Sequence, residues 1–266
     1  DFVDIDSRTW NISIEALREK LILAERSGAL PKILVPVHFA GQSCDMAAIR
    51  ELADQYRFRI IEDASHAIGG GYRNGRVGSC QFSDIAVFSF HPVKIVTTGE
   101  GGMALTNDPE LAERLRRLRS HGITRDPERM AGPADGPWYY EQTGLGFNYR
   151  MTDIQAALGI SQMRRLDAFV QRRQELADRY AEELRDLPLA LPWVAPGVAS
   201  AFHLYPVVID PGKTRRGRRE VFENLRQRGV GINVHYIPVY LQPYYRRLGF
   251  VAGYCPEAER YYANAM

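Results

Sequence analysis

Short apolar runs alternate with amphipathic helical patterns along the first half of this chain, which is typical of an α/β fold with a mainly parallel sheet. Strands are predicted at residues 33–38, 59–63, 85–90 and 102–106, with another at Phe2–Ile5. Helices are predicted from about Asp45, as N-terminal cap, to Tyr56 and from about Pro109 to Ser120. Residues 125–142 are rich in glycine and proline and predict a long surface loop.

The second half begins with a long helical pattern, predicted from about Thr152, as N-terminal cap, to Leu187. The pattern then becomes that of a small α+β unit. Its predicted elements are strands at 203–209 and 231–236, a helix at 218–228 ended by Gly229, and a helix at Ala258–Met266. We therefore predict two domains, a large one at 1–165 and a small C-terminal one at 166–266.

Composition and charge exclude several classes of protein. Of the 266 residues, 45% are hydrophobic and 25% are charged, which excludes wholesale disorder. The net charge of +2, without a lysine or arginine block, gives no electrostatic footprint for nucleic acid, and no apolar run reaches the length of a membrane span. The three cysteines are widely spaced without a CxxC pair, which favours a reducing cytoplasm and argues against a metal site.

Acidic residues and a histidine follow the predicted strand at 59–63, in the segment Glu62–His66. Open α/β sheets bind their ligands at the carboxyl ends of parallel strands, so a carboxylate at Asp63 is placed to face the crevice. Taken alone, Asp63 is more often a helix cap or a surface residue, and a single histidine such as His66 is more often structural.

A lysine lies between the next apolar strand and a glycine-rich turn, where Phe88–Lys94 is followed by Thr97–Gly102. If Lys94 is buried, loss of water lowers the pKa of its side-chain amine. A larger fraction of the amine is then neutral and can act as a nucleophile. Ser89 offers a hydroxyl, and the backbone of the turn offers N–H groups to an anion. The alternative is a tight turn whose glycines only supply positive φ angles.

Together, Asp63 and Lys94 provide the two groups that pyridoxal phosphate chemistry requires. The lysine amine bonds to the cofactor aldehyde, and the carboxylate keeps the pyridine nitrogen protonated so that the ring withdraws electrons. The same amine, once displaced by the substrate, can move a proton between substrate and cofactor carbons.

Two further polar clusters are less specific. Asn148 and Arg150 lie in Gly146–Asp153, just before the long helix, where an amide and a guanidinium could hold a phosphate or carboxylate. A capping turn with solvated side chains is the alternative. Asn233–Pro238 places polar side chains at a predicted strand end, a pattern that more often reflects packing than a site.

Four segments make the chain recognisable: EDASHA at 62–67, FSFHPVK at 88–94, TTGEGG at 97–102 and GFNYRMTD at 146–153. Their residues and order resemble the DegT-type sugar aminotransferases. This resemblance implies the fold-type I, aspartate aminotransferase-like fold, pyridoxal 5'-phosphate as cofactor, glutamate as amino donor and a nucleotide-linked keto sugar as acceptor. HFAGQ at 38–42 and the segment 233–250 most resemble the subfamily that aminates UDP-linked keto sugars for pseudaminic acid, which implies a UDP-4-keto-6-deoxy-N-acetylhexosamine acceptor.

The resemblance also implies roles for single residues. Lys94 is implied as the Schiff-base lysine, Asp63 as the partner of the pyridinium nitrogen, and His66 as a neighbour of the ring or its phenolic oxygen. Ser89 would bind the cofactor phosphate. Asn148 would reach the phosphate in a neighbouring subunit, which implies a homodimer with a shared active site.

Four residues are candidates for contacts with the substrate. Arg150, in the same turn as Asn148, is expected to bind an anionic group. His38, His235 and Tyr236 are expected on the side of the sugar.

Two other functions stay open at this stage. In the family, a Gly-Thr or Gly-Ser turn that binds the cofactor phosphate precedes the part that this chain matches, so the chain is expected to be truncated at both ends. A non-catalytic member or an inactive fragment, acting as a dimerisation or binding module, is therefore an alternative. A Rossmann dehydrogenase is disfavoured because Val37–Gly41 contains no GxGxxG motif.

Overall fold

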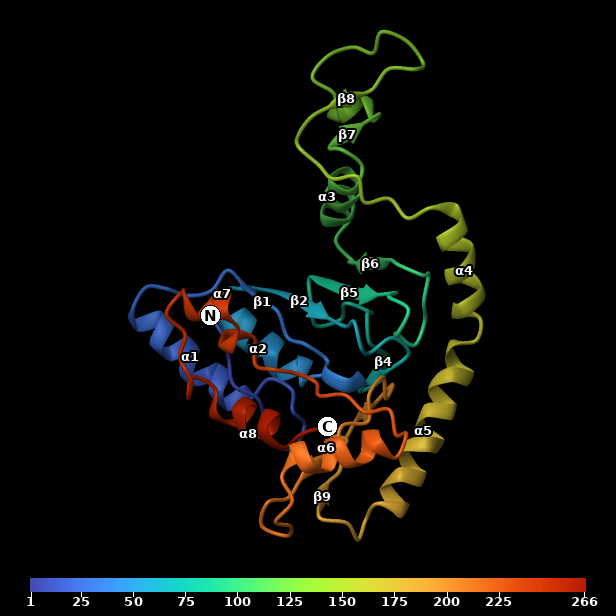
Figure 1. The fold of residues 1–266 in the computed structure, drawn as a ribbon. Coiled ribbons are helices and arrows are strands. Elements are labelled where there is room, and N and C mark those ends of the chain that lie inside the picture. The colour runs from blue at the N-terminus through green and yellow to red at the C-terminus, as the bar shows by residue number, and fades with distance from the viewer.

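The computed structural model describes residues 1–266, and its centre is a four-stranded sheet in the order β1-β2-β5-β6 (Figure 1). The strands are β1 (Ile33–Leu34), β2 (Arg59–Asp63), β5 (Ile85–Ser89) and β6 (Gly102–Leu105). β1, β2 and β5 run parallel, whereas β6 is antiparallel to β5. The mainly parallel α/β sheet is therefore confirmed, with one antiparallel edge strand.

The strand predicted at 33–38 is shorter than expected. Pro36 has no N–H group and interrupts it, so that only β1 and an isolated bridge between Val37 and Asp63 remain. Hydrogen bonds nevertheless continue along β2, from the Asp63 N–H to the Pro36 carbonyl at 2.9 Å and from the His38 N–H to the Asp63 carbonyl at 3.0 Å. The backbone of Asp63 is thus held on this side by the segment after β1.

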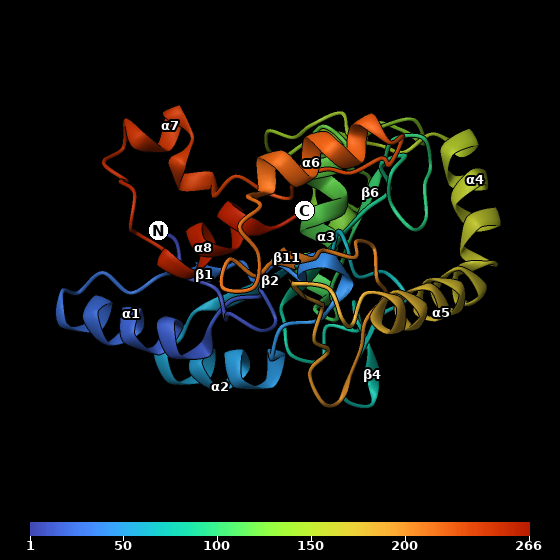
Figure 2. The same cartoon turned by 60° about the horizontal axis from the view of Figure 1, so that its bottom comes forward.

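Helices α1 (Ile14–Arg26) and α2 (Met46–Tyr56) pack side by side on one face of the sheet (Figure 2). The cap predicted for α2 is confirmed, because the Asp45 carboxylate accepts a hydrogen bond from the Ala48 N–H. The prediction missed α1, which begins at the cap Ser13. Leucines of α1 join α2 and β2 in one core cluster, whose buried members are Leu17, Leu21, Cys44, Met46, Ala47, Ile49, Leu52, Ala53, Phe58, Ile60 and Tyr72.

The single long helix predicted at 152–187 is wrong, because two helices occupy this stretch. They are α4 (Asp153–Met163) and α5 (Leu166–Glu183), and the chain turns between them. The cap at Thr152 is confirmed and forms a reciprocal capping box with Gln155. The start of α5 packs on a second core cluster, made by the segments after β2 and β5, in which Leu166 contributes a buried side chain.

An arm, residues 107–152, projects away from the sheet between β6 and α4 (Figure 1). It contains α3 (Pro109–Arg119), close to the helix predicted there, and the hairpin of β7 (Ile123–Thr124) and β8 (Glu141–Gln142). The stretch 125–142 is mostly loop, as predicted, apart from β8 and a short 3-10 helix, η2 (Pro127–Arg129).

The C-terminal part has less strand structure than predicted. Only β11 (Val208–Ile209) forms within 203–209, and residues 231–236 form no strand, so these two predictions are wrong. The helices α6 (Arg218–Gln227), followed by Gly229, and α8 (Pro256–Asn264) are close to expectation. The remaining elements are β3 (Gly71–Tyr72), β4 (Gly75–Arg76), β9 (Leu189–Ala190), β10 (Val198–Ala199), α7 (Pro243–Arg246) and the 3-10 helices η1 (Phe39–Gly41) and η3 (Val239–Leu241).

The first residues lie against α8 (Figure 2). The strand predicted at Phe2–Ile5 is wrong, since only an isolated bridge from Ile5 to Ile12 forms. Instead, Asp4 accepts hydrogen bonds from the N–H groups at the start of α8, Glu257 at 2.9 Å and Ala258 at 3.0 Å. No helix combines the length and apolar character needed to cross a membrane.

Candidate active site

Asp63 is the last residue of β2 and lies beside β5, opposite Val87. Its carboxylate accepts a hydrogen bond from the Ser65 N–H at 3.1 Å. The N–H of Ala64, the residue after Asp63, donates to the Val87 carbonyl at 2.9 Å. Since both flanking strands fix its backbone, Asp63 is a carboxylate on a rigid element at the carboxyl edge of the sheet.

Lys94 lies in the loop that joins β5 to β6. The loop is tied back to β5 because the Thr98 N–H donates to the Phe90 carbonyl at 3.0 Å, and Val96 is fully buried beneath it. Lys94 is half-buried. Burial lowers the pKa of its ammonium, and the nearby charge of Asp63 opposes this shift. Lys94 and Asp63 therefore act on each other electrostatically, and the effect of burial on the pKa of Lys94 is the larger of the two.

His66 and His203 lie against each other beside Lys94. Their ring centroids are 4.5 Å apart, and both side chains are more than nine-tenths buried. Burial and the charge of Lys94 lower the pKa of His66 to about 4. Burial, the charge of His66 and that of Lys94 lower the pKa of His203 to about 3. Both rings are therefore neutral near pH 7.

His203 reaches this place because its segment packs on the turn at η1. The N–H groups of Ala201 and Leu204 donate to the carbonyls of Gly41 and Ala40 at 2.9 and 3.2 Å. Gly41 has φ +108°, and a Cβ atom there would lie 2.9 Å from the His203 nitrogen, so glycine is required. Sequence reasoning missed His203, which it placed as the first residue of a strand, and no local feature of the sequence indicates its position beside His66.

Of the residues expected on the side of the sugar, His235 and Tyr236 join the cluster. The ring of Tyr236 lies 6.3 Å from that of His66 between centroids. Burial and the charge of Lys94 lower the pKa of His235, and burial raises the pKa of Tyr236.

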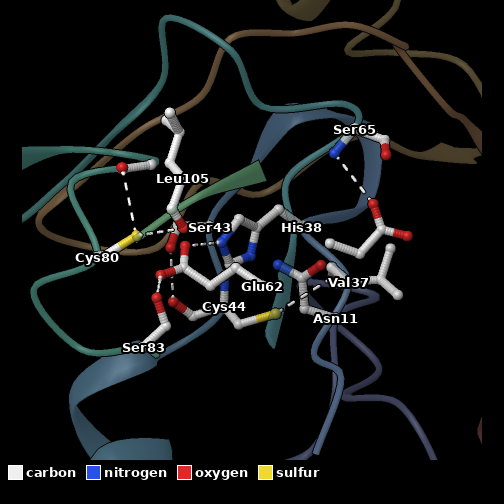
Figure 3. A network of polar contacts seen from close by, with 12 residues as sticks. Asn11, Val37, His38, Ser43, Cys44, Glu62, Ser65, Cys80, Ser83 and Leu105 are labelled. Carbon is white, nitrogen blue, oxygen red and sulfur yellow. Dashed lines mark hydrogen bonds and ion pairs between the residues drawn. The ribbon is translucent and has the colours of Figure 1, made fainter. Parts of the chain in front are cut away.

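His38 is placed elsewhere, which corrects the expectation that it contacts substrate. Its side chain is fully buried, with Nε2 2.8 Å from the Glu62 carboxylate and Nδ1 3.2 Å from the Cys44 N–H (Figure 3). The Ser83 hydroxyl donates to the same carboxylate. Because both ring nitrogens are engaged inside the core, His38 holds the segment after β1 against β2 and offers nothing to a ligand.

The remaining predicted residues form no hydrogen bond or ion pair with Lys94 or Asp63 of the same chain. Ser89 ends β5 at the same edge of the sheet, and its hydroxyl accepts a hydrogen bond from the His91 N–H at 3.4 Å. Asn148 and Arg150 are exposed on the arm, before α4, and no contact joins them to Lys94 of the same chain.

A mainly parallel α/β sheet with a lysine and a carboxylate at its carboxyl edge agrees with the fold-type I class of aminotransferases that the sequence implied. The whole chain, residues 1–266, matches the family described as "DegT/DnrJ/EryC1/StrS aminotransferase family". The chain belongs to this family, which confirms the resemblance found in the sequence.

Curated relatives share this assignment along most of the chain. The spore coat polysaccharide biosynthesis protein SpsC of Bacillus subtilis is 38% identical over 268 residues, covering 100% of this chain and 67% of that protein. The UDP-4-amino-4,6-dideoxy-N-acetyl-beta-L-altrosamine transaminase of Campylobacter jejuni is 36% identical over 250 residues, covering 93% of this chain and 62% of that protein. The chain thus spans about two thirds of the length of the relatives that it matches.

Solved structures confirm the predicted fold class. PseC of Helicobacter pylori, an aminotransferase involved in the biosynthesis of pseudoaminic acid, superposes with a TM-score of 0.87 at 32% identity, over 100% of this chain and 66% of that one. The sugar aminotransferase Spr1654 of Streptococcus pneumoniae, in its PLP-form, superposes with a TM-score of 0.84 at 27% identity, over 99% of this chain and 68% of that one.

The cluster in this chain fits the family's cofactor. His66 Nδ1 and His203 Nδ1 are buried and have no hydrogen-bond partner within the chain, as expected of groups that face a ligand. Beside them are an amine with a lowered pKa and a carboxylate, which suit an aldehyde and a pyridine nitrogen.

Proposed function

We propose that the protein containing this chain is a pyridoxal phosphate-dependent aminotransferase that moves an amino group from glutamate to a nucleotide-linked keto sugar. The observation that carries this proposal is the placement of Lys94, with its lowered pKa, within range of the Asp63 charge at the carboxyl edge of the sheet. Membership of a sugar aminotransferase family supports it. The likeness to the Campylobacter transaminase and to PseC favours a UDP-4-keto-6-deoxy-N-acetylhexosamine as acceptor.

The chemistry that pyridoxal phosphate supplies when bound is an aldehyde that amines attack and a ring that withdraws electrons. Lys94 Nζ would hold the cofactor at its aldehyde carbon, with loss of water, and once displaced would accept and return a proton as a neutral amine. Its lowered pKa suits both roles, because each requires the neutral amine.

Asp63 and His66 control protonation around the ring. The Asp63 carboxylate would accept a hydrogen bond from the N–H of the pyridine ring, and its negative charge would keep that nitrogen protonated. His66 is neutral near pH 7 and so offers one donor and one acceptor nitrogen to the ring or its phenolic oxygen without adding charge.

Other residues bind anions and the sugar. Ser89, at the end of β5, donates its hydroxyl to the cofactor phosphate, and Asn148 of a second copy reaches the same phosphate in a homodimer with shared active sites. Arg150 binds an anionic group of the substrate, and His235 and Tyr236 contact the sugar. We place the protein in the cytoplasm, in keeping with its three free, buried cysteines.

The test uses the full-length protein, with the segments that complete the relatives, purified with pyridoxal phosphate. A visible absorption band of the covalently attached cofactor should appear and should bleach when glutamate is added. Lys94→Ala should lack the band, whereas Lys213→Ala, an exposed lysine, should retain it.

The outcomes separate the two open functions. A full-length protein without the band, or with a band that survives Lys94→Ala, contradicts the proposal. A band that glutamate leaves unchanged favours the non-catalytic binding module.

A further inference from the structure

The arm contains a hollow of about 410 Å³ that is separate from the cluster around Lys94. Five residues line it: Ser120, Ile123, Arg125, Tyr140 and Arg150. Four of the five carry hydrogen-bond donors, and Arg125, Tyr140 and Arg150 are exposed to solvent. The hollow is therefore a polar, accessible depression rather than a gap in a core.

Three segments that are distant in sequence build this hollow. Pairing of β7 with β8 sets Thr124 opposite Glu141, so Arg125 and Tyr140 are neighbours at the next position along the hairpin. The segment that carries Arg150 is fixed to the end of α3. In that contact the His121 N–H donates to the Phe147 carbonyl at 2.8 Å and the Tyr149 N–H to the Arg119 carbonyl at 3.0 Å.

The close approach of these segments depends on Gly122. Its φ is +72°, and a Cβ atom there would overlap the backbone of Gly144 and Leu145. Beside it, an isolated bridge pairs Ser120 with Asn148. The backbone thus holds the Ser120 and Arg150 sides of the hollow together.

The hollow is strongly cationic. No carboxylate lines it, and neither Arg125 nor Arg150 forms an ion pair. Other arginines of the arm are neutralised, Arg117 by Glu113 at 3.9 Å and Arg129 by Glu110 at 3.2 Å. Two free guanidinium groups beside two hydroxyl donors are suited to phosphate or carboxylate oxygens.

The charges favour one class of anion. A diphosphate that joins a nucleoside to a sugar carries two negative charges and no positive charge, which matches two guanidinium groups. Glutamate also carries an ammonium group, and the hollow has no carboxylate to pair with it. Resting on the proposed function and its shared active sites, we infer that Ser120, Arg125, Tyr140 and Arg150 form the binding site for the diphosphate of a nucleotide-linked substrate whose sugar is held at Lys94 of a second copy.

The test measures binding of UDP to the full-length protein by calorimetry, with uridine and glutamate as comparison ligands. Arg125→Gln and Arg150→Gln should each weaken UDP binding about tenfold or more, because each removes a charge-assisted hydrogen bond. Arg116→Gln, which removes an arginine of the same arm outside the hollow, should change the Kd less than about twofold. Affinity for uridine, which has no phosphate, should stay unchanged in all three variants.

An unchanged UDP affinity in Arg125→Gln, with unaltered circular dichroism and Tm, overturns the inference. So does a loss of glutamate binding without a loss of UDP binding, which would make the hollow a carboxylate site. UDP binding requires neither cofactor nor amino transfer, so this result is independent of the absorption test above. If the diphosphate site is wrong, Arg125→Gln still shows the visible absorption band of the cofactor. If the proposed function is wrong, the unaltered protein itself lacks that band.

Discussion

The imidazole rings of His66 and His203 lie 4.5 Å apart between centroids, although one follows β2 and the other belongs to the segment that packs on η1. Burial disfavours the charged form of both rings, Lys94 adds to that cost for each, and His66 adds to it for His203. Both imidazoles are therefore uncharged near pH 7. They lie beside the Lys94 amine, which must also be neutral to react.

Acid should destabilise the fold through this pair. An unfolded histidine takes up a proton near pH 6.5, whereas folded His66 does so only at about pH 4 and His203 at about pH 3. Between these values the unfolded state binds more protons, so the free energy of unfolding should fall as the pH drops below about 6.5. For His66 the loss is on the order of 3 kcal/mol by pH 4.

Urea unfolding at intervals between about pH 7.5 and pH 4.5 measures this slope. His203→Asn should make the dependence on pH shallower, because it removes one of the two imidazoles whose pKa is lowered in the folded state. A slope in His203→Asn equal to that of the unaltered protein would show that the pair does not carry the effect.

Lys94 should react with acylating reagents at lower pH than an ordinary lysine, because burial lowers its pKa. Asp63→Asn removes the charge that opposes this shift, so the pKa of Lys94 should fall further. Mass spectrometry of cofactor-free protein, labelled across a range of pH, gives the midpoint for the Lys94 peptide. The exposed Lys213 is the internal control, and its labelling should be the same with and without Asp63→Asn.

Breaking the buried pair of His38 and Glu62 should be costly. Glu62→Leu removes the acceptor of both His38 and the Ser83 hydroxyl, and should lower the free energy of unfolding by about 3 to 5 kcal/mol. In the double variant that combines His38→Leu and Glu62→Leu, the free energy of unfolding should fall by less than the sum of the losses in the two single variants. Urea denaturation measures all three, with the exposed Glu51→Gln expected within about 0.5 kcal/mol of the unaltered protein.

Gly69 should tolerate alanine less well than another glycine of the same conformation. Gly69 and Gly229 both have φ +81°, but a Cβ atom at Gly69 would lie 2.7 Å from Val170 Cγ2, whereas none lies within 4 Å of Gly229. Gly229→Ala should lower the free energy of unfolding by about 1 kcal/mol, because alanine disfavours a positive φ. Gly69→Ala should lower it by about 1 to 3 kcal/mol more, because its Cβ also overlaps Val170. Val170→Ala should recover part of this difference in thermal unfolding; no recovery would mean that the close contact with α5 is not the cause.

The homodimer should depend on apolar side chains near the arm. Leu145 and Ile154 are 91% and 84% exposed, which is unusual for large aliphatic residues unless a partner covers them. Ile154→Asp should therefore convert the full-length protein to a monomer in sedimentation experiments. Leu23→Asp, on the exposed face of α1, should leave the dimer intact. A monomeric unaltered protein would contradict the shared active site.

The sequence was sufficient to predict those elements whose structure depends on interactions between neighbouring residues. The caps at Asp45 and Thr152, the apolar strand before Asp63 and the loop position of Lys94 all follow from neighbours within a few residues. The helix α1 was missed, although the cap Ser13 and the spacing of Leu17 and Leu21 were local signs of it.

Long-range partners decided the rest. Residues 203–209 have the composition of a strand, but Leu204 bonds to the Ala40 carbonyl and Val207 to the Met266 carbonyl, so their partners lie far away in the sequence. The same packing brings His203 to the site. His38 was predicted as the last residue of the strand at 33–38 and as a contact of the sugar, and only the position of Glu62 in the folded chain shows that its side chain is engaged inside the core. The division into domains at residue 165 stays a prediction.

The buried contact between His38 and Glu62 also constrains how this protein can evolve. A replacement of either residue alone leaves the other polar group without its partner inside the core, so a lineage must cross an unstable intermediate to replace the pair with apolar side chains. Among homologous sequences, positions 38 and 62 should therefore vary together, although neither residue meets the substrate.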